Sequence, residues 1–475
     1  MYPNFLRLRW RVLAIAMVVI SAAVEVLVAA EPQPELRAGA AVVNITPPLG
    51  IGMAGYYHPR GARGTHDDLF AKAIVIQSGE ERAALVALDL ISTTLPMVEA
   101  SRREIEKATG ISGKAVMISA THAHTGPVLS HRGRREADLG GKADLAQHYS
   151  AQLPTKIAEC VRLAASRLQP TRVLAAIGRE EHLSYNRRFH MKDGTVGWNP
   201  GKRNPNIVRP AGPIDPDVGV LVFEALAGKA RPRALATYVN FAMHPDTVGG
   251  EFFSADYPGV LARRLAEYKG SDMVTLFANG ACGNLNHIDV AWAEPQKGPE
   301  EAARIGTILA AAVFQAYKQL APVAAGPLRW RCKRVALPLA PITPDDVKQA
   351  EATLAKLGRK ERVPFLEQVQ AYKVLDVAGR QGKPLEVEVQ VIALGSDVAW
   401  VSLPGEIFVE LGLAIKKASP FRYTMIAELA NGSIGYVPNR SAYAEGNYEV
   451  VSARCAEGSG ELLVQTALAL LEELR

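Results

Sequence analysis

Two histidines one residue apart, His122 and His124, are the residues of this chain whose type and spacing point most directly to chemistry. They follow an apolar segment, residues 115–118, that is typical of a buried strand. In an extended chain, residues i and i+2 point to the same side. The pattern therefore predicts that both imidazoles face one point at a strand end, which is where open α/β sheets bind ligands. A His-x-His pair is not specific by itself, so partners must come from elsewhere.

Three further residues follow predicted strands and carry suitable donor atoms: His244, Glu406 and Tyr436. Two histidines and one carboxylate form a common catalytic zinc site with an open position for water, and a phenolate oxygen is a less usual fourth ligand. Simpler interpretations exist for each residue. His122 and His244 could be solvated loop or turn residues, Glu406 could open a helix and stabilise its N-terminus, and Tyr436 could be a half-buried aromatic. Spacing alone does not show that these residues converge.

Several other enzyme classes are excluded by missing motifs. The chain has no G-x-S-x-G segment, which argues against an α/β-hydrolase serine triad. It has neither a G-x-x-x-x-G-K-[ST] phosphate loop nor an H-E-x-x-H helix. The formal net charge of +6 is spread without a Lys/Arg block, so nucleic acid is not expected as a partner. No protein partner is implied, and the mild positive charge is compatible with contact at an anionic membrane surface.

The N-terminus predicts export. Arg7, Arg9 and Arg11 precede an apolar run, residues 12–24, and small residues follow it. This order of basic, apolar and small residues is typical of a secretory signal peptide, here residues 1–30, and predicts a periplasmic or secreted protein. Glu25 interrupts the run before it reaches the length of a membrane span. An uncleaved N-terminal membrane anchor is the alternative.

The four cysteines, Cys160, Cys282, Cys332 and Cys455, form no C-x-x-C pair, which argues against a thiolate zinc site. In an exported protein they could form one or two disulfides, and four cysteines allow three full pairings. Free buried thiols are the other interpretation, and the sequence does not choose between them.

Strand and helix patterns alternate along the chain. This alternation predicts an α/β fold in which mixed sheets are covered by helices, as one large domain over residues 31–475. Residues 338–384 depart from the pattern as a polar helical insertion that begins at Thr343 with a capping residue and a following proline. Residues 385–391 then alternate with period two, which predicts a half-exposed strand. The expected strands are 71–77, 82–90, 173–177, 218–223, 235–241, 273–278, 398–403 and 423–429, and the expected helices are 97–109, 145–168, 258–268, 300–320 and one from about Ser459.

An ordered series of short motifs gives the chain a family resemblance. The chain resembles the neutral/alkaline, non-lysosomal ceramidase family, specifically its N-terminal catalytic domain. The resemblance covers residues 44–449, most of the mature chain, and the ordered set is more specific than any one piece. The matching segments are Asn44-Ile-Thr-Pro-Pro48, Met53-Ala-Gly-Tyr56, residues 66–73, Val86-Ala-Leu-Asp89, Thr121-His-Ala-His-Thr-Gly-Pro127, Tyr185-Asn-Arg187, Phe241-Ala-Met-His-Pro245, residues 254–259, Pro404-Gly-Glu406, and Tyr436, Tyr443 and Tyr448-Glu449.

The resemblance implies a zinc ion held by His122, His244, Glu406 and Tyr436. It also implies that His124 lies beside the metal and handles protons or substrate. Arg187 and Tyr448 resemble the family's residues that polarise the amide carbonyl. These roles suit amide hydrolysis, because zinc lowers the pKa of bound water to about 7 and donors stabilise the oxyanion.

One departure from the family pattern concerns the catalytic serine. The family has a Gly-Asp-Val-Ser-Pro-Asn segment, whereas this chain has Gly283-Asn-Leu-Asn286-His-Ile288. Asn286 cannot act as the hydroxyl does, although its amide can donate a hydrogen bond to the oxyanion. A route through a serine is therefore in doubt, and direct attack by zinc-activated water remains. After the tyrosine series only about one helix follows, so the C-terminal immunoglobulin-like domain of characterised ceramidases is not expected.

The sequence thus predicts an exported zinc-dependent amidohydrolase of the ceramidase-like family. Its substrate by resemblance is the N-acyl amide of a ceramide-like lipid, which would place the protein in sphingolipid metabolism. Two alternatives stay open because the serine is missing. One is a zinc-dependent deacylase or esterase of acylated sugars or other small compounds. The other is a non-catalytic homologue that binds a metal or ligand.

Overall fold

The computed structural model describes residues 35–130, 133–226 and 233–475. The predicted signal peptide, residues 1–30, lies outside this part of the chain. Within the described ranges, no helix is both long enough and apolar enough to cross a bilayer. The residues from Glu35 to Arg475 form one contact unit.

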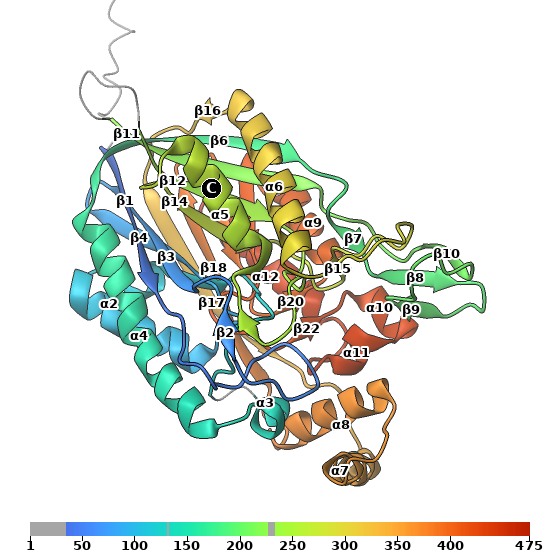
Figure 1. Ribbon diagram of the computed structural model, residues 1–475. Helices are drawn as coiled ribbons and strands as arrows, with labels where there is room; N and C mark the ends of the chain where they lie inside the picture. Colours follow the sequence, from blue (N-terminus) through green and yellow to red (C-terminus); the bar gives the residue numbers. More distant parts are fainter. Residues whose placement is uncertain (1–34, 131–132, 227–232) are drawn as a thin grey trace, which may run out of the picture. The chain divides into compact units, whose positions relative to one another are not determined.

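A large mixed sheet forms the centre of this unit (Figure 1). Its strand order is β14-β12-β11-β6-β1-β3-β4-β5, and the short strand β16 also pairs with β6. The pairs β12–β14 and β4–β5 are parallel and the others are antiparallel, which confirms the predicted mixed α/β fold. The strands are β1 (Leu36–Asn44), β3 (Phe70–Ser78), β4 (Glu81–Leu88), β5 (Val116–Ala120), β6 (Gln169–Arg179), β11 (Asp217–Ala225), β12 (Arg233–Phe241), β14 (Val274–Asn279) and β16 (Ala321–Pro322).

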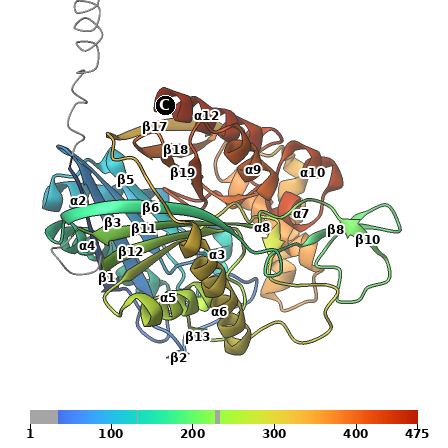
Figure 2. The same ribbon diagram turned by 90° about the horizontal axis from the view of Figure 1, so that it is seen from above.

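A second sheet packs against the first and is covered by helices on its outer side (Figure 2). Its strands are β17 (Leu328–Leu337), β18 (Leu385–Leu394), β19 (Val398–Ser402) and β21 (Tyr423–Ala427). Trp400 of β19 meets Tyr238 of β12, so the two sheets share a core. The outer helices are α2 (Leu95–Thr109), α4 (Ala143–Ser166), α5 (Asp256–Lys269) and α6 (Pro299–Ala316) on the first sheet, and α9 (Val409–Ala418) and α12 (Ser459–Glu473) on the second.

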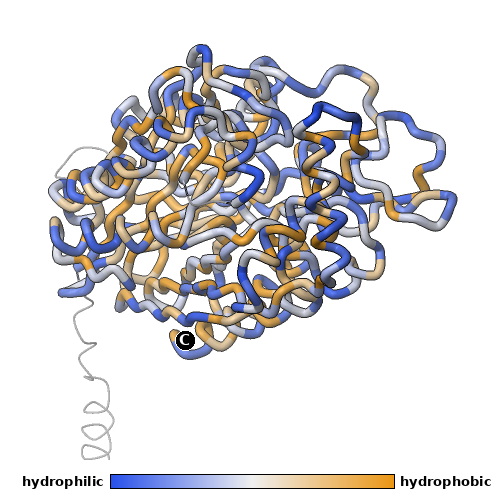
Figure 3. Tube along the Cα trace, turned by 90° about the horizontal axis from the view of Figure 1, so that it is seen from below, coloured by the Kyte–Doolittle hydropathy of each residue, from blue (hydrophilic) through white to orange (hydrophobic). Residues whose placement is uncertain are grey.

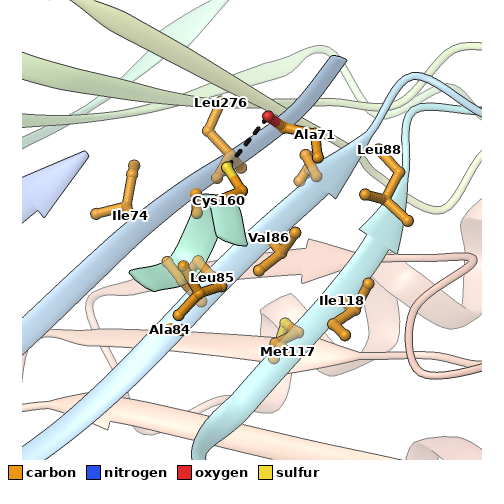
Figure 4. Packing of buried hydrophobic residues seen from close by; sticks show 14 of the residues in the cluster. Ala71, Ile74, Ala84, Leu85, Val86, Leu88, Met117, Ile118, Cys160 and Leu276 are labelled. Atoms are coloured by element: carbon orange, nitrogen blue, oxygen red, sulfur yellow. Dashed lines mark hydrogen bonds between the residues drawn. The ribbon is translucent and has the colours of Figure 1, made fainter. Parts of the chain in front are cut away.

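Hydrophobic residues fill the strands of the interior, as the orange stretches of the trace in Figure 3 show. The packing around Cys160 is typical. This residue of α4 lies among side chains of β3 and β4, and its thiol donates a hydrogen bond to the Ala71 carbonyl at 3.2 Å (Figure 4). All four cysteines are free thiols, so the structure favours free thiols over disulfides.

Two local predictions were wrong. Residues 385–391 form β18, but this strand is buried rather than half-exposed, because β17 and β19 flank it and Glu388 makes an ion pair with Arg102 at 2.8 Å. Glu406 was expected to open a helix, yet it lies in a two-residue strand, β20 (Glu406–Ile407), and α9 begins three residues later.

The polar segment after residue 338 contains two helices, α7 (Pro344–Gly358) and α8 (Phe365–Ala378), which lie side by side (Figure 1). Thr343 caps α7 as the sequence indicated: its side chain accepts from the Asp346 backbone and Asp346 returns the bond. The predicted helix 145–168 is α4, which begins at Ala143 and continues through Pro154.

Short strands and loops bring the site residues together. The strand β20 pairs in parallel with β22 (Tyr436–Val437), and β15 (Leu285–Asn286) pairs with β7 (Tyr185–Asn186). A three-stranded ribbon of β8 (Arg188–Met191), β9 (Val196–Trp198) and β10 (Ile207–Pro210) follows β7, and α3 (Arg134–Leu139), α10 (Arg440–Glu445) and α11 (Tyr448–Ser452) lie nearby. The parallel strands β2 (Gly64–Thr65) and β13 (Phe252–Phe253) complete this region.

Candidate metal centre

Three of the four predicted metal ligands converge on one point. The His122 Nε2 atom lies 3.5 Å from Glu406 Oε2, and His244 Nε2 lies 3.3 Å from the same oxygen. Both histidines are buried, and the imidazole centroids are 4.5 Å apart. Residues that are 122 to 284 positions apart in sequence therefore present their donor atoms to a common position.

The backbone at His122 differs from the extended geometry that the sequence suggested. His122 has φ of 75°, in the left-handed region that a residue with a side chain seldom adopts. Its N–H donates to the Leu90 carbonyl at 2.9 Å, which holds this conformation. The prediction that i and i+2 share a side through an extended chain was therefore wrong. A strained turn instead places the His122 and His124 Nε2 atoms 3.3 Å apart, and such strain is typical of functional sites.

The hydrogen bonds behind the two rings fix which nitrogen faces the centre. The Nδ1 atom of His122 lies 2.7 Å from the Ile91 carbonyl, and that of His244 lies 2.9 Å from the Cys282 carbonyl. A carbonyl oxygen only accepts, so each Nδ1 carries the proton and each Nε2 presents a lone pair. Metal-binding histidines are oriented in this way.

Two imidazole lone pairs and a carboxylate oxygen that face one another repel unless a positive charge lies between them. Burial opposes the charged form of His122, yet Glu406 raises its pKa, whereas burial and the Arg187 charge lower the pKa of His244 to about 3. Burial would raise the pKa of Glu406, but the two histidines hold it well below the usual range. This donor set fits a divalent cation with nitrogen and oxygen ligands.

His124 provides a third imidazole. The ligand nitrogens of His122, His124 and His244 lie within 4.8 Å of one another, so this buried group could hold a metal ion. The His124 Nδ1 atom is 3.5 Å from Asp246 Oδ1, and its backbone carbonyl accepts from Arg60 at 2.8 Å. Burial and the neighbouring histidines lower the pKa of His124 well below its usual value, which keeps the ring neutral.

Tyr436 is placed by backbone pairing, because Glu406 and Tyr436 are direct partners in the β20–β22 ladder. The Tyr436 hydroxyl accepts a hydrogen bond from Arg187 Nη2 at 3.0 Å. Burial raises the pKa of Tyr436 well above 10, although the Arg187 charge opposes the shift. The phenol is therefore protonated unless a cation displaces its proton.

Arg187 is held rigidly beside this tyrosine. Its Nε donates to Glu449 Oε1 at 2.8 Å, and its Nη2 donates to the Gly283 carbonyl at 2.7 Å. In the described part of the chain its Nη1 makes no hydrogen bond, so one face of the guanidinium can serve a ligand. The ring of Tyr448 packs edge-on against Tyr436 with centroids 5.4 Å apart.

Asn286 lies apart from these groups. Its amide nitrogen donates to Asn199 Oδ1 at 3.0 Å, and its oxygen accepts from the Ile288 backbone at 3.1 Å. A cavity of about 350 Å³ contains His122, His124, Glu406, Tyr436 and Tyr448 in its wall, whereas Asn286 does not line it.

Sequence reasoning missed several supporting residues. Asp246 contacts His124 and accepts a short hydrogen bond from the Tyr56 hydroxyl. Glu428 is buried behind the centre, where its carboxylate accepts from the backbone of Cys282 at 3.1 Å and of Ile407 at 2.8 Å. Asp246 follows His244 by two positions, which is a usable signal, but Glu428 stands in an apolar strand pattern that gives none.

Comparison with known proteins shows what the chain as a whole is similar to. No protein-family model matches the chain. The neutral ceramidase of Pseudomonas aeruginosa is 24% identical over an alignment of 499 positions, which covers 89% of this chain and 70% of the ceramidase. The crystal structure of that neutral ceramidase superposes with a TM-score of 0.72 and 23% identity, over 93% of this chain and 75% of the ceramidase chain. The chain is similar in sequence and in fold to neutral ceramidase. A second structure, of a ceramidase complexed with C2, gives a TM-score of 0.73 at 22% identity, with the same coverage of both chains.

The neutral ceramidase fold accounts for the layered arrangement of this chain. Beside Glu406, the buried group of His122, His124 and His244 could hold a metal ion.

Proposed function

We propose that this chain is an exported zinc-dependent hydrolase that cleaves an N-acyl amide, with a ceramide-like lipid as the substrate class that the homology suggests. The observation that carries the proposal is the orientation of His122 and His244. Both rings are anchored at Nδ1 by backbone carbonyls and direct their Nε2 lone pairs at Glu406. A cation between them would stabilise such an arrangement of acceptors.

Zinc is the metal that best fits these ligands, which would be His122, His244, Glu406 and Tyr436. When bound, zinc supplies an acidified water molecule and polarises the substrate carbonyl. The three-histidine group with His124 is an alternative ligand set.

The protein's own groups suit the rest of amide hydrolysis. Arg187 stays charged, and its free Nη1 is available to the developing oxyanion of the substrate. Its position is fixed by Glu449 and the Gly283 carbonyl, so little reorganisation is needed during reaction. The Tyr448 phenol in the cavity wall is a second donor to the same oxygen.

His124 is suited to proton transfer. Its ring is neutral because burial lowers the pKa, and it lies next to His122 at the centre. A neutral imidazole can accept a proton from the attacking water and deliver it to the leaving amine. The carboxylate of Asp246 lies 3.5 Å from Nδ1 on the far side of the ring and favours a positive charge on it.

The experiment is a hydrolysis assay on purified protein with zinc and an N-acyl lipid. We expect release of fatty acid by the wild-type chain and none by His122→Ala. The control is His148→Ala, which removes an exposed histidine of α4 and should leave the rate unchanged. Equal turnover by wild type and His122→Ala would contradict the metal assignment.

The same assay should include acetylated sugars and small esters, because Asn286 stands where the family has serine. Hydrolysis of these compounds without hydrolysis of N-acyl lipids would replace the lipid by a small acylated substrate. Metal analysis separates these two hydrolases from a non-catalytic protein. A zinc-dependent hydrolase should contain about one zinc per chain, whereas a protein without bound zinc would favour a non-catalytic binding role.

A further inference from the structure

The cavity beside the metal centre is lined by two half-buried arginines that the proposed reaction does not use. Arg135 comes from α3, and Arg454 follows α11. Both line the cavity of about 350 Å³ that also contains His122 and Glu406. Their side chains are only 17% and 23% exposed, which is low for arginine and calls for an explanation.

Each arginine is balanced by one carboxylate on one edge of its guanidinium. Arg135 Nε donates to Glu136 at 3.0 Å, and Arg454 Nε donates to Asp376 at 2.9 Å. The other oxygen of Asp376 already accepts from the Arg134 backbone at 2.9 Å. The carboxylates therefore fix the two guanidiniums in place, and Asp376 of α8 ties α3 to the segment after α11.

The second edge of each guanidinium remains available. In the described part of the chain, Nη1 of Arg135 and Nη1 of Arg454 make no hydrogen bond. Arg454 Nη1 lies against Gly435, where an added Cβ would come within 2.9 Å of it, and Gly435 directly precedes Tyr436. Arg454 therefore borders the metal centre.

Arg135 lines the same cavity and contacts an aromatic ring. Its guanidinium packs over the Tyr57 ring at 4.7 Å. Tyr448 lines the cavity together with Arg135 and Glu406. Asp376 binds Arg454 and also accepts from the backbone of Arg134, the residue before Arg135, so the two arginines are held in neighbouring parts of one cavity wall.

A second cavity of about 340 Å³ shares Gly55, His124, Tyr436 and Tyr448 with the first. Its wall is aromatic and includes Tyr57, Trp198 and Phe365. The scissile bond would thus lie between an aromatic cavity and a cavity with two fixed guanidinium donors. An apolar chain in the cavity that Arg135 and Arg454 line would bury their free N–H donors without partners, which is costly.

We propose that the substrate carries an acidic group, a carboxylate or a phosphate, which binds Arg135 and Arg454 while the apolar part occupies the aromatic cavity. This inference rests on the proposed amide hydrolysis and narrows its substrate class from N-acyl amides in general to N-acyl amides with an acidic group. Guanidinium edges match both oxyanions in shape and charge. The same cavity wall also includes one further arginine, Arg380, and one further glutamate, Glu386.

The test compares amides that share one dodecyl or dodecanoyl chain. They are a neutral N-acyl ethanolamine, an N-acyl glycine, a succinyl amide and an N-acyl phosphoethanolamine, which place a carboxylate on either side of the bond or a phosphate on the amine side. Charge-assisted hydrogen bonds predict that at least one acidic amide exceeds the neutral one by about tenfold or more in kcat/KM. Equal kcat/KM for all four would overturn the proposal, and the preferred compound identifies the acid.

Variants tie the preference to the arginines. Arg135→Gln and Arg454→Gln should each reduce the ratio of acidic to neutral kcat/KM, whereas Arg331→Gln, an exposed residue of β17, should not. Arg454→Lys retains the charge beside Asp376 but loses the free Nη1, so it should reduce the ratio in a protein with an unchanged melting temperature. An unchanged ratio in this variant and in Arg135→Gln would contradict the proposal.

Binding separates this inference from the proposed function. If none of the four amides is cleaved, amide hydrolysis is wrong, and calorimetric binding of N-dodecanoylglycine against N-dodecanoylethanolamine decides the acid site. Tighter binding of the glycine compound that is lost in Arg135→Gln supports the site. Equal binding of the two compounds rejects it.

Discussion

Replacing Glu449 by glutamine should destabilise the protein by disturbing a buried charge cluster next to the centre. The Glu449 carboxylate is fully buried and accepts from Arg187 at 2.8 Å and from Arg188 at 3.0 Å. Arg188 also pairs with Glu445, whereas Glu449 is the one carboxylate that pairs with Arg187 among the described residues. Glu449→Gln therefore leaves Arg187 buried without a counter-charge.

Removing one partner of a buried ion pair costs roughly 3–5 kcal/mol. Because Arg188 keeps Glu445 and glutamine keeps one acceptor oxygen, we expect the lower end, about 3 kcal/mol. The measurement is the free energy of unfolding from urea titration followed by tryptophan fluorescence. Glu445→Gln is the matched control, since Glu445 is 26% exposed and its loss should cost under about 1 kcal/mol. Equal and small costs for the two variants would refute the role of Glu449 in holding Arg187.

Three further predictions concern the surroundings of the centre. Gly283→Ala should lower bound zinc, because its Cβ would come within 2.4 Å of the Glu406 carbonyl, whereas Gly358→Ala on α7 meets nothing and should retain full zinc by metal analysis. Burial raises the pKa of Glu428 to about 8, so the free energy of unfolding of chelator-treated wild type should fall as pH rises from about 4.5 to about 8. Glu428→Gln should remove this decrease. A variant with the same pH dependence as wild type in urea titrations would contradict the prediction. Asn286→Ala should reduce kcat less than tenfold, because its amide is engaged outside the cavity, and a loss near that of an oxyanion donor, about a hundredfold or more, would reverse that view.

The alternating strand and helix patterns were sufficient to predict the mixed α/β fold, because apolar residues form a short continuous run in a buried strand and recur every three or four residues in an amphipathic helix. The helix starting after Thr343 was predicted for the same reason, since its capping pattern is local. Exposure was harder to predict. Glu388 suggested a solvent-facing edge, but its partner Arg102 is 286 residues away, and the sequence does not display such long-range pairs.

The site also has features that the sequence predicted and features that it did not. Donor types at strand ends, together with the family resemblance, led to His122, His244 and Glu406, which the structure brings together. Two-residue strands such as β20 are too short to have a period, so the place of Glu406 in a ladder with Tyr436 could not be predicted. The left-handed backbone of His122 depends on a hydrogen bond to Leu90, another contact that spacing does not encode.

The most direct test of the account is anomalous diffraction at the zinc edge from crystals of the zinc-loaded protein. The account predicts one strong peak per chain, within bonding distance of His122 Nε2, His244 Nε2 and the Glu406 carboxylate. A structure without such a peak, or with zinc held only at other residues, would contradict it.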